Sequence, residues 1–107
     1  MNPAAIHRGD VWWADVPGDK RRPVLVVTRE RFVPKLNALL VAPVTSTVRG
    51  IPTEVPMSPD DGMPRACAAN FDNTFTLGRD RFDARITSLP PARLDEICEA
   101  YRFAGGC

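Results

Sequence analysis

Short apolar runs separated by proline, glycine and polar turns dominate the pattern of this chain. Val24–Val27 is a run of four aliphatic residues, and Asn37–Val44 is a second, nearly continuous apolar stretch. Runs this short and this rich in aliphatic residues are typical of strands buried on both faces. Pro23, directly before the first run, is compatible with the start of a strand. Both stretches are therefore predicted to be inner strands of a sheet.

Other segments have the composition of shorter strands. Ile51–Met57 alternates weakly and contains two prolines, so it is predicted to be an edge strand. In Gly9–Val16, the adjacent Trp12 and Trp13 would point to opposite faces of a strand, so that one indole enters the core and the other faces outward. The remaining predicted strands are Arg65–Asn70, Asn73–Leu77 and Asp83–Leu89, and the predicted loops are Arg29–Lys35 and Ser58–Pro64.

One helix is predicted near the end of the sequence, over Pro90–Arg102. Proline is tolerated in a first helical turn, Ser88 or a neighbour can cap that turn, and Gly105-Gly106 ends the helix. Its apolar stripe comprises Leu94, Ile97, Cys98 and Tyr101. Many short strands followed by one helix predict a mainly β fold, a small curled sheet or barrel. The helix packs on this sheet or on a partner subunit.

The composition is that of an ordinary soluble protein. Charged residues make up 25% and hydrophobic residues 44% of the 107 residues, which suits a single domain over residues 1–107. No apolar run approaches the length of a membrane span, and Met1–Arg8 lacks the hydrophobic region of a signal peptide. The expected location is the cytoplasm, with no membrane partner.

The three cysteines, Cys67, Cys98 and Cys107, lie at long spacings and form no CxxC pair. This pattern argues against a zinc site and against a disulfide framework. Cys67 is predicted to lie in a strand, Cys98 at a buried position of the helix, and Cys107 is a terminal thiol. The sequence also contains no glycine-rich phosphate loop and no His-Glu zinc motif, so neither a metal nor a cofactor is expected.

The charge is unevenly distributed although the net charge is only +1. A protein that coats nucleic acid without specificity would carry a larger positive charge. Basic residues nevertheless crowd the two ends of the first buried run: Lys20, Arg21, Arg22, Arg29, Arg31 and Lys35. Such a cluster on a nearly neutral protein suggests a confined site for an anion, with a solvated basic face as the alternative.

Polar groups stand at the ends of several predicted strands. Arg22 precedes the Val24–Val27 run, and three hydroxyl residues, Thr45, Ser46 and Thr47, follow the next inner strand. A guanidinium can bind a phosphate through two hydrogen bonds, and with a hydroxyl it could stabilise a phosphorane-like transition state without a metal. Further polar residues between later strands are Asn70, Asp72 and Asn73. The acidic pair Asp60-Asp61 is interpreted as a solvated turn.

Several segments, in order, form a recognisable series. They are Arg8–Asp15, Arg22–Val27, Val41–Ser46, Ile51–Val55, Asn70–Asn73 and Ile86–Leu89. This series resembles the MazF/PemK endoribonuclease toxins of type II toxin–antitoxin systems, and it covers the chain from Arg8 to about Tyr101. The resemblance implies a small SH3-like β-barrel with a C-terminal helix (the CcdB/PemK-like fold). It also implies a homodimer that binds RNA along a groove at the subunit interface.

The resemblance also implies an activity. Members of the family cleave single-stranded RNA at short sequence motifs without a metal, and leave a 2′,3′-cyclic phosphate and a 5′-hydroxyl. The family's catalytic arginine matches Arg22, and its catalytic threonine matches Thr45. The residues expected to bind RNA are Lys20, Arg21, Ser46, Thr47, Asn70, Asp72 and Asn73. The expected partner is a cognate, MazE-like antitoxin whose acidic, disordered tail covers the catalytic pair.

The chain departs from the family pattern at two places. The loop between the first two strands shrinks to residues 17–21, whereas many relatives have a longer loop that contains glycine and glutamine. Phe75 stands where several relatives carry a second functional arginine. Either Arg79 or Arg81 replaces that arginine in space, or the protein relies on Arg22 alone.

The sequence is also compatible with two other functions. A gyrase-poisoning toxin has the same fold and no catalytic groups. It depends on C-terminal residues that read Trp-Gly-Ile in its best-known form, whereas this chain reads Gly105-Gly106-Cys107. A small barrel of this kind could also bind RNA without cleaving it.

Overall fold

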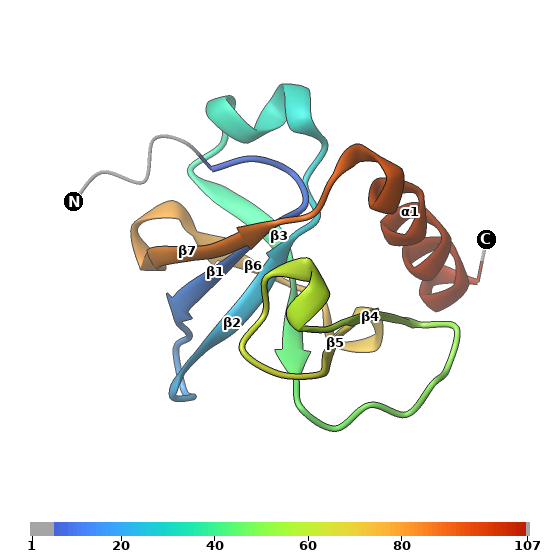
Figure 1. The fold of residues 1–107 in the computed structure, drawn as a ribbon. Helices are drawn as coiled ribbons and strands as arrows, with labels where there is room; N and C mark the ends of the chain where they lie inside the picture. The colour runs from blue at the N-terminus through green and yellow to red at the C-terminus, as the bar shows by residue number, and fades with distance from the viewer. Residues whose placement is uncertain (1–5, 107) are drawn as a thin grey trace.

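The computed structural model describes residues 6–106 and contains a curled seven-stranded sheet with one α-helix against it (Figure 1). The strands are β1 (Asp10–Asp15), β2 (Arg21–Val26), β3 (Ala38–Thr45), β4 (Glu54–Met57), β5 (Cys67–Asn70), β6 (Phe75–Gly78) and β7 (Phe82–Ser88). Helix α1 spans Pro91–Gly105. Short 3₁₀ helices connect the strands: η1 (Glu30–Lys35), η2 (Pro59–Asp61), η3 (Phe71–Asn73) and η4 (Arg79–Arg81).

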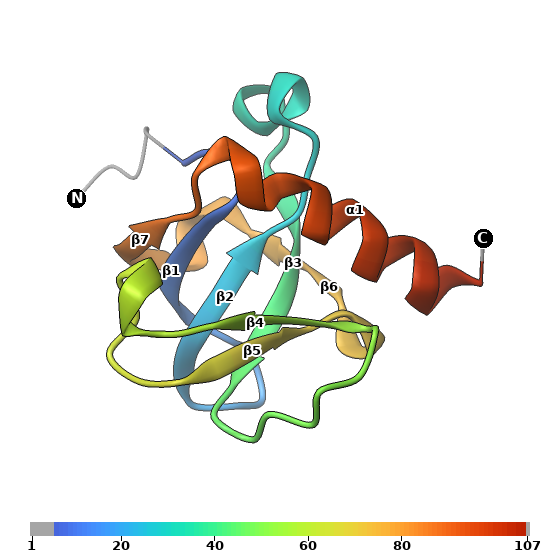
Figure 2. The same cartoon turned by 45° about the vertical axis from the view of Figure 1, so that its right-hand side comes forward.

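Strand β3 organises the sheet because two strands share one of its edges. The residues Ala38–Val41 pair with β6, whereas Val44 and Thr45 pair with β5. The other edge of β3 pairs with β2, and the strand order is β4-β5-β3-β2-β1-β7. The sheet therefore bends around β3 into a half-barrel, which is visible when the molecule is turned (Figure 2). The predicted curled, mainly β fold with a C-terminal helix is confirmed.

The inner strands are buried on both faces, as their continuous apolar runs predict. On β2, Leu25 belongs to one core cluster, whereas Val24 and Val26 belong to a second cluster on the opposite face. Ile97 and Ala100 of α1 pack into the cluster that contains Leu25. The curled sheet thus separates two small cores, and the helix covers only one of them.

The predicted strands are found within a few residues of their expected bounds. Ile51–Met57 contains β4, which lies at the edge of the sheet as predicted. Trp12 is buried, and Trp13 is half-buried beneath the guanidinium of Arg21, whose Cζ lies 4.6 Å from the ring centroid. The opposite orientations expected for the two indoles follow from the alternation of side chains along a strand.

Two predicted loops contain regular structure. Arg29–Lys35 was expected to be a loop, but Glu30–Lys35 forms η1, because Val33 is buried and fixes this segment to the core. The interpretation of Asp60-Asp61 as a solvated turn is wrong for Asp61. Its side chain completes a capping box at the start of η2, and its carboxylate pairs with the guanidinium of Arg93 at 2.5 Å.

Helix α1 differs from its prediction in its cap and in its buried face. Its N-cap is Pro90, which makes no side-chain hydrogen bond, so the proposed Ser88 cap is wrong. Ile97 and Ala100 form the buried face, whereas Cys98 and Tyr101 are exposed, so the prediction of a buried Cys98 is also wrong. Within residues 6–106, no helix is long and apolar enough to cross a membrane.

The free cysteines differ in environment. Cys67 lies in β5, as predicted, and burial raises the pKa of its thiol. Cys98 is exposed on α1, where the guanidinium of Arg8 donates a hydrogen bond to its Sγ at 3.3 Å. The prediction for Cys107 concerns a residue outside the described part of the chain.

A buried carboxylate ties the start of β1 to the end of β7. Asp10 is only 1% exposed. Its Oδ2 accepts hydrogen bonds from the backbone N–H of His7 at 2.9 Å and from Trp12 Nε1 at 3.1 Å. Its Oδ1 accepts a bond from Ser88 Oγ at 2.6 Å. No cation among residues 6–106 pairs with this buried carboxyl group, so the three donors satisfy its oxygens.

Replacement of Asp10 by alanine should destabilise the protein. The change leaves three donors without their acceptor, which should lower the free energy of unfolding by about 1–3 kcal/mol. Urea denaturation monitored by tryptophan fluorescence would measure this loss. Asp83→Ala is a matched control because Asp83 is exposed and pairs with Arg21 at the surface. Equal stability of the two variants would contradict the role of Asp10.

Candidate functional site

The ends of several strands surround a cavity of about 420 Å³. It lies between the β1–β2 turn and the β3–β4 loop, which occupy the same end of the molecule in both views (Figures 1 and 2). Its lining residues are Val16, Asp19, Arg22, Pro43, Thr45, Thr47, Arg49, Asn70, Asn73 and Phe75. We call it the strand-end cavity. It brings together Arg22 and Thr45, the pair expected from the sequence to act together.

Arg22 enters this cavity because of its position on β2. Arg21 and Arg22 are neighbours on a strand, so their side chains leave from opposite faces. The guanidinium of Arg21 pairs with Asp83 at 2.7 Å, away from the cavity. The guanidinium of Arg22 lines the cavity, donates to Asp19 Oδ2 from Nη1 at 2.7 Å and to the carbonyl of Val44 from Nη2 at 3.4 Å.

The Nε of Arg22 is buried and makes no hydrogen bond with any of residues 6–106. An unpaired buried donor costs free energy, on the order of 1–3 kcal/mol. Such groups are rare in folded proteins and are often associated with function. The guanidinium of Arg22 is therefore only partly satisfied by the protein itself.

Asp19 is the acidic partner of Arg22, and the sequence analysis missed it. The pKa of its carboxyl is lowered, first by the hydrogen bond from the backbone N–H of Lys20 and second by the hydrogen bond from Arg22. Asp19 is therefore ionised at neutral pH and balances the charge of Arg22. The i,i+3 spacing of the two residues across a turn is the signal that could have revealed this pair.

The three hydroxyl residues at the end of β3 do not all lie in the cavity. Thr45 is the last residue of β3, and its Oγ1 accepts a hydrogen bond from the backbone N–H of Thr47 at 3.1 Å. A hydroxyl that accepts one bond can still donate its proton, so Thr45 can donate to a ligand in the cavity. Thr47 also lines the cavity, whereas Ser46 is exposed and does not.

The polar residues around η3 divide between two cavities. Asn70 and Asn73 line the strand-end cavity, and Asn70 Oδ1 accepts the backbone N–H of Asp72 at 2.9 Å. Asp72 itself accepts a hydrogen bond from Thr53 Oγ1 at 2.7 Å and lines a separate groove of about 900 Å³ beside α1. Of the remaining predicted residues, neither Lys20 nor Arg21 lines the strand-end cavity.

The structure also shows where the candidate replacements for a second arginine lie. Phe75 lines the strand-end cavity, but Arg79 donates hydrogen bonds to the carbonyls of Leu36 and Val33. Arg81 pairs with Asp15 at 3.2 Å. Neither arginine lines the cavity. The additional cation in its lining is Arg49, which the sequence analysis did not select although it closely follows the three hydroxyl residues.

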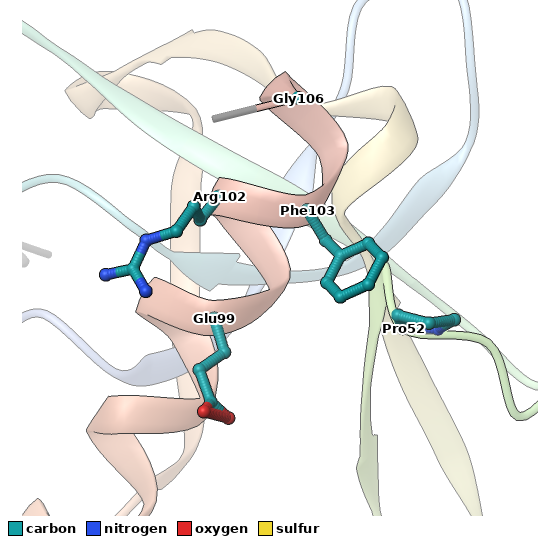
Figure 3. A pocket seen from close by; sticks show the side chains of 5 residues that line it. All are labelled: Pro52, Glu99, Arg102, Phe103 and Gly106. Atoms are coloured by element: carbon teal, nitrogen blue, oxygen red, sulfur yellow. The ribbon is translucent and has the colours of Figure 1, made fainter.

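A third cavity, of about 580 Å³, lies where the end of α1 approaches the β3–β4 loop. Figure 3 shows the ring of Phe103 directed toward Pro52, with Glu99 and Arg102 on the same helix. None of the residues predicted to be functional lines it. Among residues 6–106, no three His, Cys, Asp or Glu side chains are grouped so that they could hold a metal ion.

The sequence of this chain is similar to that of a known protein family and of several of its members. Residues 7–103 match the family described as PemK-like, MazF-like toxin of type II toxin-antitoxin system. The chain is 42% identical over 103 residues to the probable endoribonuclease MazF2 of Mycobacterium tuberculosis, which covers 95% of this chain and 100% of the relative.

Solved structures show the same similarity. The Mycobacterium tuberculosis toxin MazF-mt6 superimposes with a TM-score of 0.83 and 35% identity, covering 91% of this chain and 96% of the toxin. An endoribonuclease from a mycobacterial species, solved in complex with its cognate antitoxin, also has a TM-score of 0.83. It shares 30% identity and covers 95% of this chain and 96% of its own length.

Proposed function

The chain belongs to the PemK-like, MazF-like toxin family of type II toxin–antitoxin systems and is an endoribonuclease, and we propose that it cleaves single-stranded RNA in the strand-end cavity. The observation that carries this proposal is that Arg22 and Thr45, from different strands, line one cavity. The gyrase-poisoning and non-cleaving alternatives gain no support, because the relatives are named as endoribonucleases.

The proposed reaction is attack of a ribose 2′-oxygen on the adjacent phosphorus, with departure of the 5′-oxygen. The bond from phosphorus to the 2′-oxygen forms, and the bond to the 5′-oxygen breaks. One proton leaves the 2′-hydroxyl and one reaches the departing oxygen, so the products are a 2′,3′-cyclic phosphate and a 5′-hydroxyl. Arg22 stabilises the negative charge that builds up on the phosphoryl oxygens, and Thr45 donates a hydrogen bond to one of them.

The remaining predicted residues bind the RNA around this reaction centre. Thr47, Asn70 and Asn73 line the cavity, where side-chain amides can hydrogen-bond to the edges of unstacked bases. Lys20, Arg21 and Ser46 are exposed and are close in the sequence to Arg22 or Thr45. They contact the RNA outside the cavity. Asp72 acts from the adjoining groove beside α1. Location in the cavity supports the assignments of Thr47, Asn70 and Asn73, whereas Lys20, Arg21, Ser46 and Asp72 do not line it.

The antitoxin is the second partner that we propose. A related endoribonuclease has been solved in complex with its cognate antitoxin. An acidic, extended tail suits the positively charged residues Arg22 and Arg49 of the cavity, and a tail that folds on binding allows regulated release. The tail would cover Arg22 and Thr45 in the cytoplasm and compete with RNA. Continued RNA binding in the inhibited complex would contradict this arrangement.

We further propose a homodimer. The large apolar side chains of Trp12 and Phe71 are buried within one chain and offer no surface for a partner. Among the described residues, the two most exposed large apolar side chains lie on α1, where Tyr101 is 50% and Phe103 is 65% exposed. Large exposed rings on one helix are typical of a surface that a partner covers.

Sedimentation at micromolar concentration should show a species of twice the 11.8 kDa chain mass. Phe103→Glu should shift this species toward the monomer, because a charged group would then be buried at the interface. Phe32→Glu is the matched control, since Phe32 is also exposed but lies on η1. A wild-type monomer, or equal behaviour of the two variants, would contradict an interface on α1.

Arg22→Ala should lower the rate of RNA cleavage by about 10²–10³-fold, because it removes a preorganised charge donor. Arg21→Ala removes the same charge from the opposite face of β2 and should have a much smaller effect. The measurement is cleavage of a defined transcript in EDTA, with the sites mapped by primer extension. Cleavage by Arg22→Ala at the wild-type rate would refute the assignment of this cavity.

Thr45→Ala should reduce cleavage severely, whereas Thr47→Ala should retain most of the activity. Both residues line the cavity, but Thr47 supplies a backbone N–H to Thr45 Oγ1, a contact that survives its replacement by alanine. The same cleavage assay compares the two variants at equal protein concentration. If Thr47→Ala proves the more damaging change, the reacting hydroxyl has been assigned to the wrong residue.

A further inference from the structure

The net charge of the strand-end cavity depends on a residue that has so far been given no role toward RNA. Its charged lining residues are Asp19, Arg22 and Arg49. Asp19 and Arg22 form an ion pair at 2.7 Å and largely offset each other. Arg49 therefore carries the net positive charge of the cavity, and without it the site would be close to neutral.

Arg49 is also free to bind a ligand. Its side chain is exposed and lines the cavity. Within the described range 6–106, its guanidinium makes no hydrogen bond and no ion pair. Five other arginines are occupied: Arg8, Arg21, Arg79, Arg81 and Arg93 each donate a hydrogen bond to a carbonyl or carboxylate of the protein. Arg49 is thus a cation beside the reaction centre whose donors are available.

The backbone at Arg49 is held in place although its side chain is free. The buried carboxylate of Glu54 accepts hydrogen bonds at Oε1 from the N–H groups of Arg49 at 3.0 Å and Gly50 at 3.1 Å. Gly50 has a φ of 69°, in the left-handed region that favours glycine. Glu54 itself lies on β4 and pairs in register with Asn70, another cavity residue. The backbone of the loop is therefore fixed at Arg49, and its side chain extends from this fixed position.

We propose that Arg49 is a substrate-binding residue that holds a second RNA phosphate, next to the phosphate that reacts at Arg22. This inference rests on the proposed function of the strand-end cavity. A guanidinium can bind a phosphate through two hydrogen bonds, and a single RNA strand presents a phosphate at every nucleotide. Arg49 supplies the cation that neither Arg79 nor Arg81 supplies. It contributes to binding and to register, whereas Arg22 acts on the reacting phosphate.

The test measures binding separately from chemistry. The probe is a single-stranded RNA oligonucleotide that spans a mapped cleavage site and carries a 2′-deoxy nucleotide at that site, so that it cannot be cut. Arg49→Ala should weaken binding about tenfold, as expected for the loss of hydrogen bonds to a charged group. It should also reduce the slope of log K against log salt concentration by about 0.7, the value for one phosphate contact of a single strand.

Two variants serve as comparisons. Arg49→Lys keeps the charge and should retain the salt dependence, but it should lose part of the affinity because an ammonium group cannot bind the phosphate with the two-pronged geometry of a guanidinium. Arg85→Ala removes an exposed arginine of β7 that does not line the cavity, and it should match the wild type. With cleavable RNA, Arg49→Ala should raise KM about tenfold and change kcat little, because the lost contact exists before and during the reaction.

Unchanged affinity and salt slope in Arg49→Ala would overturn the proposal. A loss of kcat without a change in KM would also overturn it, because Arg49 would then act in the chemical step. Failure of the proposed function has a different signature. In that case the wild-type protein would leave RNA intact in EDTA, or Arg22→Ala would cut as fast as the wild type, whatever the behaviour of Arg49→Ala.

Discussion

The division of one edge of β3 between two partners is the constraint on which the site depends. Because β6 pairs with the first half of β3 and β5 with its end, the sheet must bend at this strand. The bend brings the end of β3, the end of β5 and the start of β2 to one side of the molecule. Thr45, Asn70 and Arg22 stand at these three strand ends. Strand pairing therefore positions these three residues, and the β1–β2 turn and the β3–β4 loop complete the cavity with Asp19, Thr47 and Arg49.

The sequence was sufficient to predict the fold because its apolar runs are short, rich in aliphatic residues and clearly separated. The run Val24–Val27 predicts burial on both faces, and the two core clusters confirm it. Features that depend on tertiary contact were not predictable in the same way. Cys98 fits an apolar stripe at helical spacing, yet α1 meets the sheet through Ile97 and Ala100, so the buried face lies to one side of that stripe. Similarly, η1 forms around the buried Val33 despite a polar, loop-like sequence.

The position of a residue at a strand end, together with the alternation of side chains along the strand, predicted the cavity residues better than the clustering of charge did. Arg22 and Thr45 were selected because each stands at a strand end, and the structure places both in the cavity. The basic cluster was a weaker guide, since Arg21 leaves the opposite face of β2 and pairs with Asp83. Asp19 and Arg49 were missed because both belong to connections, where the sequence pattern does not determine which way a side chain points. Their roles depend on turn geometry and on the buried Glu54.

The pair between Asp19 and Arg22 has a consequence for the energetics of binding. A guanidinium in water must lose part of its hydration shell before it can accept an anionic ligand. In this protein, the folding of the β1–β2 turn has already replaced part of that shell by a carboxylate. Under the proposed function, an arriving RNA phosphate would exchange with this carboxylate on an exposed turn, and most of the reorganisation would take place in the Asp19 side chain. Arg22 would then have an anionic neighbour both before and after the substrate binds, and its orientation would be set before the substrate arrives.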